Sequence, residues 1–281
     1  MFDTRLSVER NREHYNSVYE SLELEPLLDR ARDLGFFTGA IRKHTSWHGL
    51  YRDGFAQRLG GRTVLELGAG DGLNALIMAR LGARVTAVEI AEPAVRMLRH
   101  AASVLSLEVN AVCGDFLAAD FPQFDFIVGK AFLHHLDHEL EERFVRKCAA
   151  LLKRNGEARF MEPAVNSALL DTVRWIVPAP ERPSILQRAA FAEWQASDPH
   201  PKRDQSSAHY ARVGKKYFRT VHVIPFAGLE RFRRVIPNRT ASEAYAEWAL
   251  RAEPKILPAS VRCLIARAQT IIYANPLREG R

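Results

Sequence analysis

The feature that most constrains this chain is an apolar run that leads directly into a glycine-rich loop. Thr63-Val-Leu-Glu-Leu67 has the composition of a buried strand, and glycine follows at positions 68, 70 and 72. Glycine has no Cβ and tolerates positive φ, so the backbone of such a loop can approach a ligand closely. A strand, a glycine loop and a following helix therefore predict a nucleotide-like ligand at the carboxyl end of the strand.

The spacing and the charge of this loop distinguish two kinds of ligand. A dinucleotide-binding loop carries its third glycine five residues after the first, where this chain has Leu73. Glu66 and Asp71 flank the loop, and carboxylates repel phosphate but suit a cationic group. The loop therefore favours a ligand with an amino group over a pyrophosphate.

Further strand-like segments end in acidic residues. Residues 83–90 predict a second strand that carries Glu89 at its end, where a carboxylate suits the two hydroxyls of a ribose. Residues 108–116 predict a third strand that ends in Asp115. Two more apolar segments complete the pattern, each with a turn at one end: residues 124–136 and residues 151–162.

In this order and spacing, the chain resembles the class I S-adenosylmethionine-dependent methyltransferases. The resemblance implies a Rossmann-like three-layer α/β/α sandwich with a mostly parallel seven-stranded sheet, and S-adenosyl-L-methionine as the cofactor. It also implies that Asp115 bonds the exocyclic amine of the adenine and that Phe116 lies beside the ring. The cofactor-binding residues expected on these grounds are Glu66, Gly68, Ala69, Gly70, Asp71, Glu89, Ile90, Gly114, Asp115, Phe116 and Lys130.

The chain divides into four zones. Residues 1–60 predict an N-terminal helical extension, and residues 61–163 predict the Rossmann-like core that binds the cofactor. Proline-punctuated connections interrupt residues 164–218 and disfavour a central strand there, so this zone is expected to form an inserted helical cap over the acceptor site. Residues 219–281 are expected to close the sheet with two strands, Thr220–Phe226 and Arg267–Ala274, and to form a helix from Ala241 to Arg251 between them.

Two histidines are the first candidates for catalysis. Methyl transfer depends mainly on positioning, and a general base helps when the acceptor is a hydroxyl. His134 and His135 directly follow the fourth predicted strand, and an imidazole titrates near neutral pH. The alternative is that the pair caps the next helix or packs beneath the loop. The residues expected in the acceptor pocket are Tyr15, Tyr19, Glu162, His209 and Tyr210.

The net charge of +7 is unevenly spread. Residues 1–150 hold 18 Lys and Arg against 21 Asp and Glu, giving −3, while residues 151–281 hold 22 against 12, giving +10. A basic half indicates a nucleic-acid face, an anionic-lipid face, attraction of an anionic small substrate, or an ordinary solvated surface. Arg203 and Arg212 in the predicted cap are expected to be exposed and to steer an anionic acceptor. No array of stacking aromatics accompanies the basic residues, which disfavours nucleic acid.

The cysteines and the apolar runs limit the class of protein. Cys113, Cys148 and Cys263 are isolated in the sequence, so neither a disulfide nor a metal site is expected. There is no run of twenty apolar residues and no apolar leader at the start, so we expect no membrane span and a cytoplasmic location. The oligomeric state stays open between a monomer and a homodimer.

These observations together predict a methyltransferase that modifies an O, N or S atom of a small metabolite, with an anionic metabolite as one candidate. Two alternatives stay open: a methyltransferase that acts on RNA or protein through its basic C-terminal half, and a non-catalytic cofactor-binding module. Exocyclic amines of DNA are not expected acceptors. The chain has Gly129-Lys-Ala-Phe132 where base-modifying enzymes carry Asn or Asp before two prolines and an aromatic residue.

Overall fold

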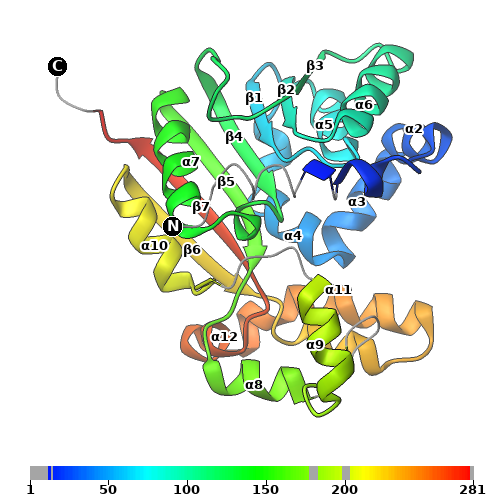
Figure 1. Ribbon diagram of the computed structural model, residues 1–281, viewed down its shortest axis with the longest axis vertical. Coiled ribbons are helices and arrows are strands. Elements are labelled where there is room, and N and C mark those ends of the chain that lie inside the picture. Colours follow the sequence, from blue (N-terminus) through cyan, green and yellow to red (C-terminus); the bar gives the residue numbers. More distant parts are fainter. Residues whose placement is uncertain (1–11, 14, 177–182, 198–202, 279–281) are drawn as a thin grey trace.

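A single sheet of seven strands organises the molecule (Figure 1). The computed structural model describes residues 12–13, 15–176, 183–197 and 203–278. The strand order is β3-β2-β1-β4-β5-β7-β6, with β1 to β5 parallel and β7 antiparallel to both β5 and β6. This confirms the expected mostly parallel sheet with an antiparallel end. The strands are β1 (Thr63–Leu67), β2 (Arg84–Glu89), β3 (Val109–Cys113), β4 (Phe124–Lys130), β5 (Leu152–Pro163), β6 (Phe218–Phe226) and β7 (Ala268–Pro276).

Helices cover both faces of the sheet, which confirms the three-layer sandwich. Successive residues of a strand point to opposite faces, so Val64 and Leu65 of β1 enter different cores. One core lies under α2 (Leu24–Arg32), α3 (Leu34–Lys43), α4 (Thr45–Tyr51), α5 (Leu73–Arg80) and α6 (Glu92–Val104). The other core lies under α7 (His138–Leu151) and α10 (Ser207–Lys215).

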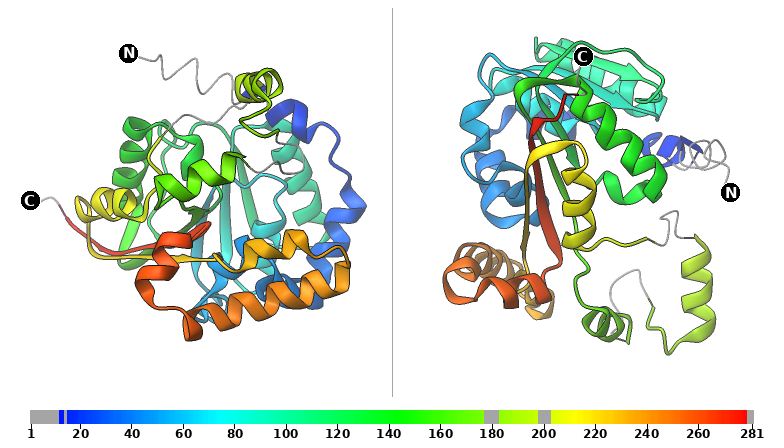
Figure 2. Two further views of the ribbon diagram at one scale, coloured as in Figure 1. Left: turned by 90° about the horizontal axis from the view of Figure 1, so that it is seen from below. Right: turned by 90° about the vertical axis from the view of Figure 1, so that its left-hand side faces the viewer.

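The described residues of the zone expected to form a helical cap form three helices with different surroundings. α10 packs against β6, β7 and α7, and so belongs to the sandwich. α8 (Ala168–Ile176) and α9 (Arg188–Ser197) instead extend away from the sheet (Figure 2). Aromatic rings join these two helices, because the Trp175 ring lies 5.5 Å from Phe191 and 5.6 Å from Trp194.

The last strands also enclose helices. A helix expected over residues 241–251 is longer, because the Asn238 side chain accepts a hydrogen bond from the Ala241 amide and starts α11 (Arg239–Ile256). η3 (Glu230–Val235) precedes it and α12 (Ala259–Ile265) follows it. Figures 1 and 2 show α8, α9, α11 and α12 together at one end of the molecule, opposite β3 and α6. We call this the helical end.

Candidate functional site

The glycine loop joins β1 to α5 in a conformation that requires glycine. The φ angles are 65° at Gly68, 56° at Gly70 and 77° at Gly72. The Gly68 amide donates a hydrogen bond to the Val88 carbonyl at 2.9 Å, which ties the loop to the end of β2. A Cβ at Gly68 would lie only 2.5 Å from the Phe132 ring. Any other residue there would clash as well as strain the backbone.

Two carboxylates lie at the same edge of the sheet, at the ends of β2 and β3. Glu89 accepts hydrogen bonds from the Gly70 amide at 3.0 Å and from the Ile90 amide at 2.8 Å. Asp115 accepts one from the Leu117 amide at 2.8 Å. Backbone N–H groups therefore hold both acids in place before any ligand binds.

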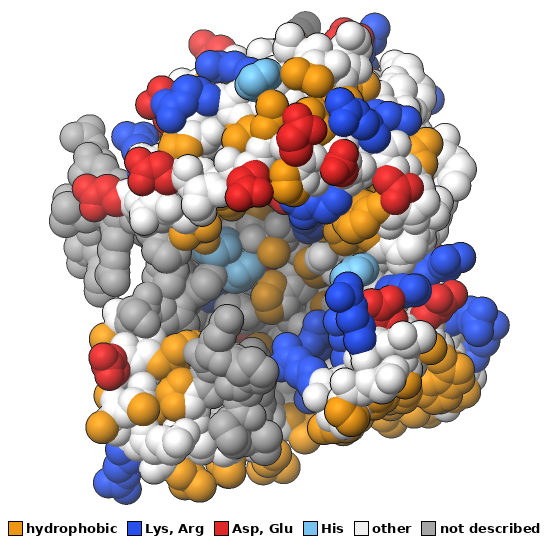
Figure 3. Space-filling view, turned by 90° about the vertical axis from the view of Figure 1, so that its right-hand side faces the viewer, with side chains coloured by type: hydrophobic (Ala, Val, Ile, Leu, Met, Phe, Trp, Pro, Cys, Tyr) orange, Lys and Arg blue, Asp and Glu red, His pale blue; other side chains and the backbone are white. Residues whose placement is uncertain are grey.

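A cavity of about 550 Å³ opens at this edge, and every residue expected to bind the cofactor lines it. The eleven residues belong to the ends of β1, β2, β3 and β4 and to the loops after them, so the parallel topology brings them together. Tyr15, Val18, Tyr19 and Leu22 of the N-terminal segment also line the cavity. Figure 3 shows a cleft between the helical end and the rest of the molecule, with histidine side chains visible in it.

Two ionisable groups of opposite sign face the cavity. The Glu66 carboxyl is buried, and its Oε1 accepts a hydrogen bond from Asn74 Nδ2 at 2.6 Å. Its Oε2 has no hydrogen-bond partner among the described residues. Burial raises the pKa of Glu66 to about 8, and the bond from Asn74 opposes this shift. Burial lowers the pKa of Lys130, whose Nζ lies 4.2 Å from the centre of the Trp47 ring.

A tyrosine and a histidine also meet in the cavity. Tyr15 Oη lies 3.1 Å from His135 Nδ1, and both residues line the cavity. The Tyr15 and Tyr19 rings stack with their centres 5.8 Å apart. Burial, with the nearby carboxylate of Glu89 as the next cause, raises the pKa of Tyr19, so its hydroxyl stays protonated.

His134 occupies a different position from His135. It does not line the cavity, and its Nδ1 lies 2.7 Å from Glu162 Oε2. The Glu162 side chain is fully buried and also accepts hydrogen bonds from the amides of Phe132 at 2.9 Å and Leu133 at 2.7 Å. Glu162 therefore holds the short helix η2 (Leu133–His135), which carries both histidines, against the end of β5.

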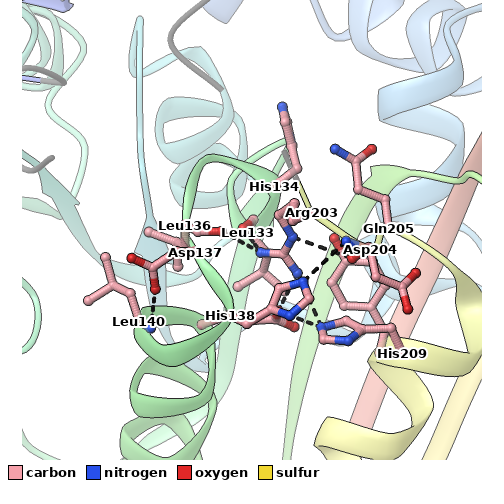
Figure 4. Close-up of polar contacts among 12 residues, drawn as sticks. Leu133, His134, Leu136, Asp137, His138, Leu140, Arg203, Asp204, Gln205 and His209 are labelled. Atoms are coloured by element: carbon pink, nitrogen blue, oxygen red, sulfur yellow. Dashed lines mark hydrogen bonds and ion pairs between the residues drawn. The ribbon is translucent and has the colours of Figure 1, made fainter. Parts of the chain in front are cut away.

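A second buried network holds the other end of this segment (Figure 4). The Arg203 guanidinium donates to the carbonyls of Leu133 at 2.8 Å and Leu136 at 2.6 Å, and it pairs with Glu141. His209 Nε2 lies 2.8 Å from the same Glu141 carboxylate. The Arg203 side chain is only 1% exposed, so the expectation that it lies on the surface and steers a substrate was wrong.

Three residues expected in the acceptor pocket do not line the cavity: Glu162, His209 and Tyr210. The Ser206 hydroxyl accepts a hydrogen bond from the His209 amide and starts α10. That helix buries His209 and Tyr210 against the sandwich. Arg212, one turn later, is exposed as expected.

The apolar wall of the cavity is what sequence reasoning missed. The sequence predicts part of this wall, because Leu136 just before α7 and Leu140 and Phe144 within α7 recur at intervals of four residues, which is typical of one face of a helix. No described residue between 164 and 218 lines the cavity, so the wall comes from the N-terminal segment, η2 and α7. The apolar and aromatic lining residues missed are Val18, Leu22, Leu67, Val88, Ala131, Phe132, Leu136, Leu140 and Phe144.

Neither a metal site nor a membrane-spanning helix is found in the described part of the chain. No group of three or more His, Cys, Asp or Glu side chains there has the arrangement of a metal site. Across those residues, every helix is too short or too polar to traverse a lipid bilayer.

Comparisons with known proteins give a consistent result. Residues 64–156 match the family model of the methyltransferase domain. The chain is 34% identical over 104 residues to the ubiquinone biosynthesis O-methyltransferase of Coxiella burnetii, covering 36% of this chain and 44% of that protein. It is 39% identical over 114 residues to the cypemycin N-terminal methyltransferase of a Streptomyces species, covering 40% and 42%. The match therefore spans less than half the length of these curated relatives.

One solved structure shows how far the likeness in fold extends. Phosphoethanolamine N-methyltransferase 2 of Haemonchus contortus, solved with phosphomonomethylethanolamine and S-adenosylhomocysteine, superposes with a TM-score of 0.55. The alignment covers 92% of this chain and 61% of that one, at 12% sequence identity. At this identity the likeness concerns the fold alone.

Proposed function

Because this chain carries a class I S-adenosylmethionine-dependent methyltransferase domain, we propose that it transfers a methyl group from S-adenosyl-L-methionine to an O, N or S atom of a small molecule. The observation that carries the proposal is one cavity that joins the glycine loop, the carboxylates of Glu89 and Asp115, and the pair formed by Tyr15 and His135. The first three features suit the cofactor, and we assign the pair to the acceptor.

The charges of the cavity fit the proposed cofactor. The unpartnered Oε2 of Glu66 suits the amino group of the methionine moiety, and Lys130 suits its carboxylate. Glu89 is placed for the ribose hydroxyls, and Asp115 with Phe116 for the adenine. When bound, S-adenosylmethionine supplies an electrophilic methyl group on a sulfonium sulfur.

His135 is the residue that we assign to proton removal when the acceptor is a hydroxyl. It lines the cavity, whereas His134 is buried against Glu162, so we reserve the base role for His135 and a positioning role for His134. Tyr15 orients the His135 ring through its hydroxyl. The His135 imidazole would accept the proton of an acceptor hydroxyl. The bound cofactor would supply the methyl group, and its sulfur would keep the electron pair of the broken sulfur–carbon bond.

The apolar part of the cavity wall favours an apolar or aromatic acceptor. It includes Leu136, Leu140 and Phe144 and the rings of Tyr15 and Tyr19. Arg203 was expected to attract an anionic acceptor, but its guanidinium bonds the Leu133 carbonyl and the Glu141 carboxylate inside the protein. An aromatic or aliphatic molecule with one hydroxyl or amine therefore fits the wall better than a strongly anionic metabolite.

The test is turnover with labelled cofactor. The full chain is incubated with a small-molecule extract and S-adenosylmethionine that carries an isotopically labelled methyl group, and new labelled products are sought by mass spectrometry. We expect at least one product that disappears in the Gly68→Val variant. Cofactor binding by calorimetry without any labelled product in small-molecule, RNA or protein pools would instead support a non-catalytic module.

The alternative acceptors are separated in the same experiment. Label in the RNA or protein fraction, with none in the small molecules, would assign the basic C-terminal half to macromolecular recognition.

A cytoplasmic location is part of the proposal, because both the cofactor and small-metabolite acceptors are available there. Fractionation of cells that express the full chain tests this location.

A further inference from the structure

Exposed apolar side chains are concentrated at the helical end. Most of the exposed large hydrophobic residues in the described ranges fall between positions 169 and 264, although this stretch is about a third of the chain. Soluble surfaces carry such residues singly, whereas a group on neighbouring elements marks an interaction surface. The members on η3, α11 and α12 are Phe232, Val235, Trp248, Ile256, Val261 and Leu264.

The sequence of α11 explains how this surface is built. Ala246, Ala249, Leu250 and Glu253 are its buried positions and face the body of the protein. The opposite side of the helix carries Trp248, Arg251 and Lys255 at intervals of three and four residues. The outward side of α11 therefore carries one aromatic side chain, Trp248, which is 45% exposed, and two basic side chains.

The same region carries exposed basic side chains, whereas its carboxylates are buried or half-buried. Glu230 and Glu253 are buried, Glu243 pairs with Lys43 of α3 and with Arg239, and Glu247 pairs with Arg42 of α3. Between residues 229 and 266, all of them described, no aspartate or glutamate is as exposed as the four basic residues Arg234, Arg239, Arg251 and Lys255.

We propose that this apolar and basic surface, formed by η3, α11 and α12, docks the protein on an anionic lipid bilayer. Aliphatic side chains and a tryptophan enter the boundary between headgroups and acyl chains, while arginine and lysine bind the anionic headgroups. The left view of Figure 2 shows α11 and α12 next to each other at the helical end. Binding of this kind is peripheral and needs no spanning helix.

Two other occupants suit the surface less well. A nucleic acid would use the positive charge but would gain little from Val235, Val261 and Leu264, which offer no stacking face. A second copy of the chain would bring the same basic residues against themselves across a two-fold axis, and like charges would repel. An anionic bilayer satisfies both the charge and the apolar residues.

The experiment is vesicle co-sedimentation of the full chain. Vesicles of phosphatidylcholine are compared with vesicles in which about one lipid in three is phosphatidylglycerol, at low and at high salt. We expect binding to the anionic vesicles that weakens as salt rises, and at least about tenfold weaker binding to the neutral ones. Equal binding to both, or binding to neither, would overturn the proposal.

Variants assign the binding to this surface. Arg251→Gln with Lys255→Gln should weaken anionic vesicle binding by about ten- to thirtyfold, since each basic residue near the headgroups contributes about fivefold. Trp248→Ser should weaken it through loss of the apolar contribution. The matched controls are Arg96→Gln and Val104→Ser on α6, which are also exposed but lie at the opposite end of the molecule. Equal loss in the controls would contradict the assignment.

Two further measurements decide between occupants. The wild type and the same variants are tested for binding to a single-stranded RNA oligonucleotide by fluorescence anisotropy. The mass of each protein in solution is measured by light scattering. RNA binding tighter than vesicle binding at the same salt, or a dimer that Trp248→Ser dissociates, would overturn the lipid proposal in favour of that partner. A monomer that binds anionic vesicles and releases RNA at moderate salt supports it.

Discussion

At the scale of single residues, the proton on Glu66 links the cofactor site to pH. Burial raises the pKa of Glu66 to about 8, so near pH 7 the folded protein holds this carboxyl neutral. A cationic ligand beside it favours the ionised form and lowers that pKa, so we expect cofactor binding at pH 7 to release a proton. Calorimetry in buffers of different ionisation enthalpy measures the release.

The Glu66→Gln variant provides the contrast. It should bind S-adenosylhomocysteine about ten- to a hundredfold more weakly, because a charge-assisted hydrogen bond of about 1.5–3 kcal/mol is lost, and it should release no proton. The pKa of Glu66 is raised on folding, so the contribution of this carboxyl to stability is full below about pH 4.5 and is lost as the pH rises through about 8. The variant should lack this fall. A proton release that persists in the variant would assign it to another group.

His135 and Tyr15 carry the second prediction at this scale. His135→Gln should lower kcat by about 10²- to 10⁴-fold with a hydroxyl acceptor, because the general base is lost. Tyr15→Phe should lower it less, since the hydroxyl only orients the ring. Cofactor affinity should change little in both variants. Unchanged kcat in His135→Gln, measured with the acceptor found by mass spectrometry, would show that positioning alone suffices.

At the scale of elements, Arg203 joins the segment before α10 to η2 and α7. Its guanidinium is buried with Glu141, so Arg203→Gln leaves a buried carboxylate without its charged partner and should cost about 3–5 kcal/mol of unfolding free energy. Arg212→Gln is the control, because that side chain is mostly exposed and its loss should cost less than about 0.5 kcal/mol. Urea denaturation monitored by circular dichroism measures both.

The double variant tests the network itself. Glu141→Gln with Arg203→Gln should be less destabilised than the sum of the two single variants, because removing both charges removes the unpaired one. Strict additivity would mean that the two side chains stabilise the protein independently. The unfolding free energies of the single and double variants are compared at one pH.

These elements also show where sequence reasoning succeeds. The strands of the core could be predicted because each joins an apolar run to a turn with glycine or an acidic residue, and these signals are local. Arg203 could not be placed, because its burial depends on η2 and α7, which lie about 60 to 70 positions earlier in the sequence. The polar residues that follow Arg203 in the sequence, Asp204 to Ser207, are typical of a solvent-exposed helix start.

At the scale of the whole molecule, the cofactor residues could be predicted and the acceptor wall could not. Parallel strands place their carboxyl ends at one edge, so the order of motifs alone brings Gly68, Glu89 and Asp115 together. The wall instead depends on how the N-terminal segment crosses that edge, and Val18 and Leu22 carry no chemical motif. The expected cap contributes none of its described residues to the cavity.

The last prediction follows from this arrangement. Because Tyr15 to Leu22 line the cavity and α8 does not, binding of S-adenosylhomocysteine should slow amide hydrogen exchange in residues 15–22 and in the glycine loop, and leave residues 168–176 nearly unchanged. Exchange detected by mass spectrometry on the full chain, with and without ligand, measures both segments at once. If ligand protects α8 as strongly as the N-terminal segment, then the helical end closes over the cleft and the inserted zone acts as a cap.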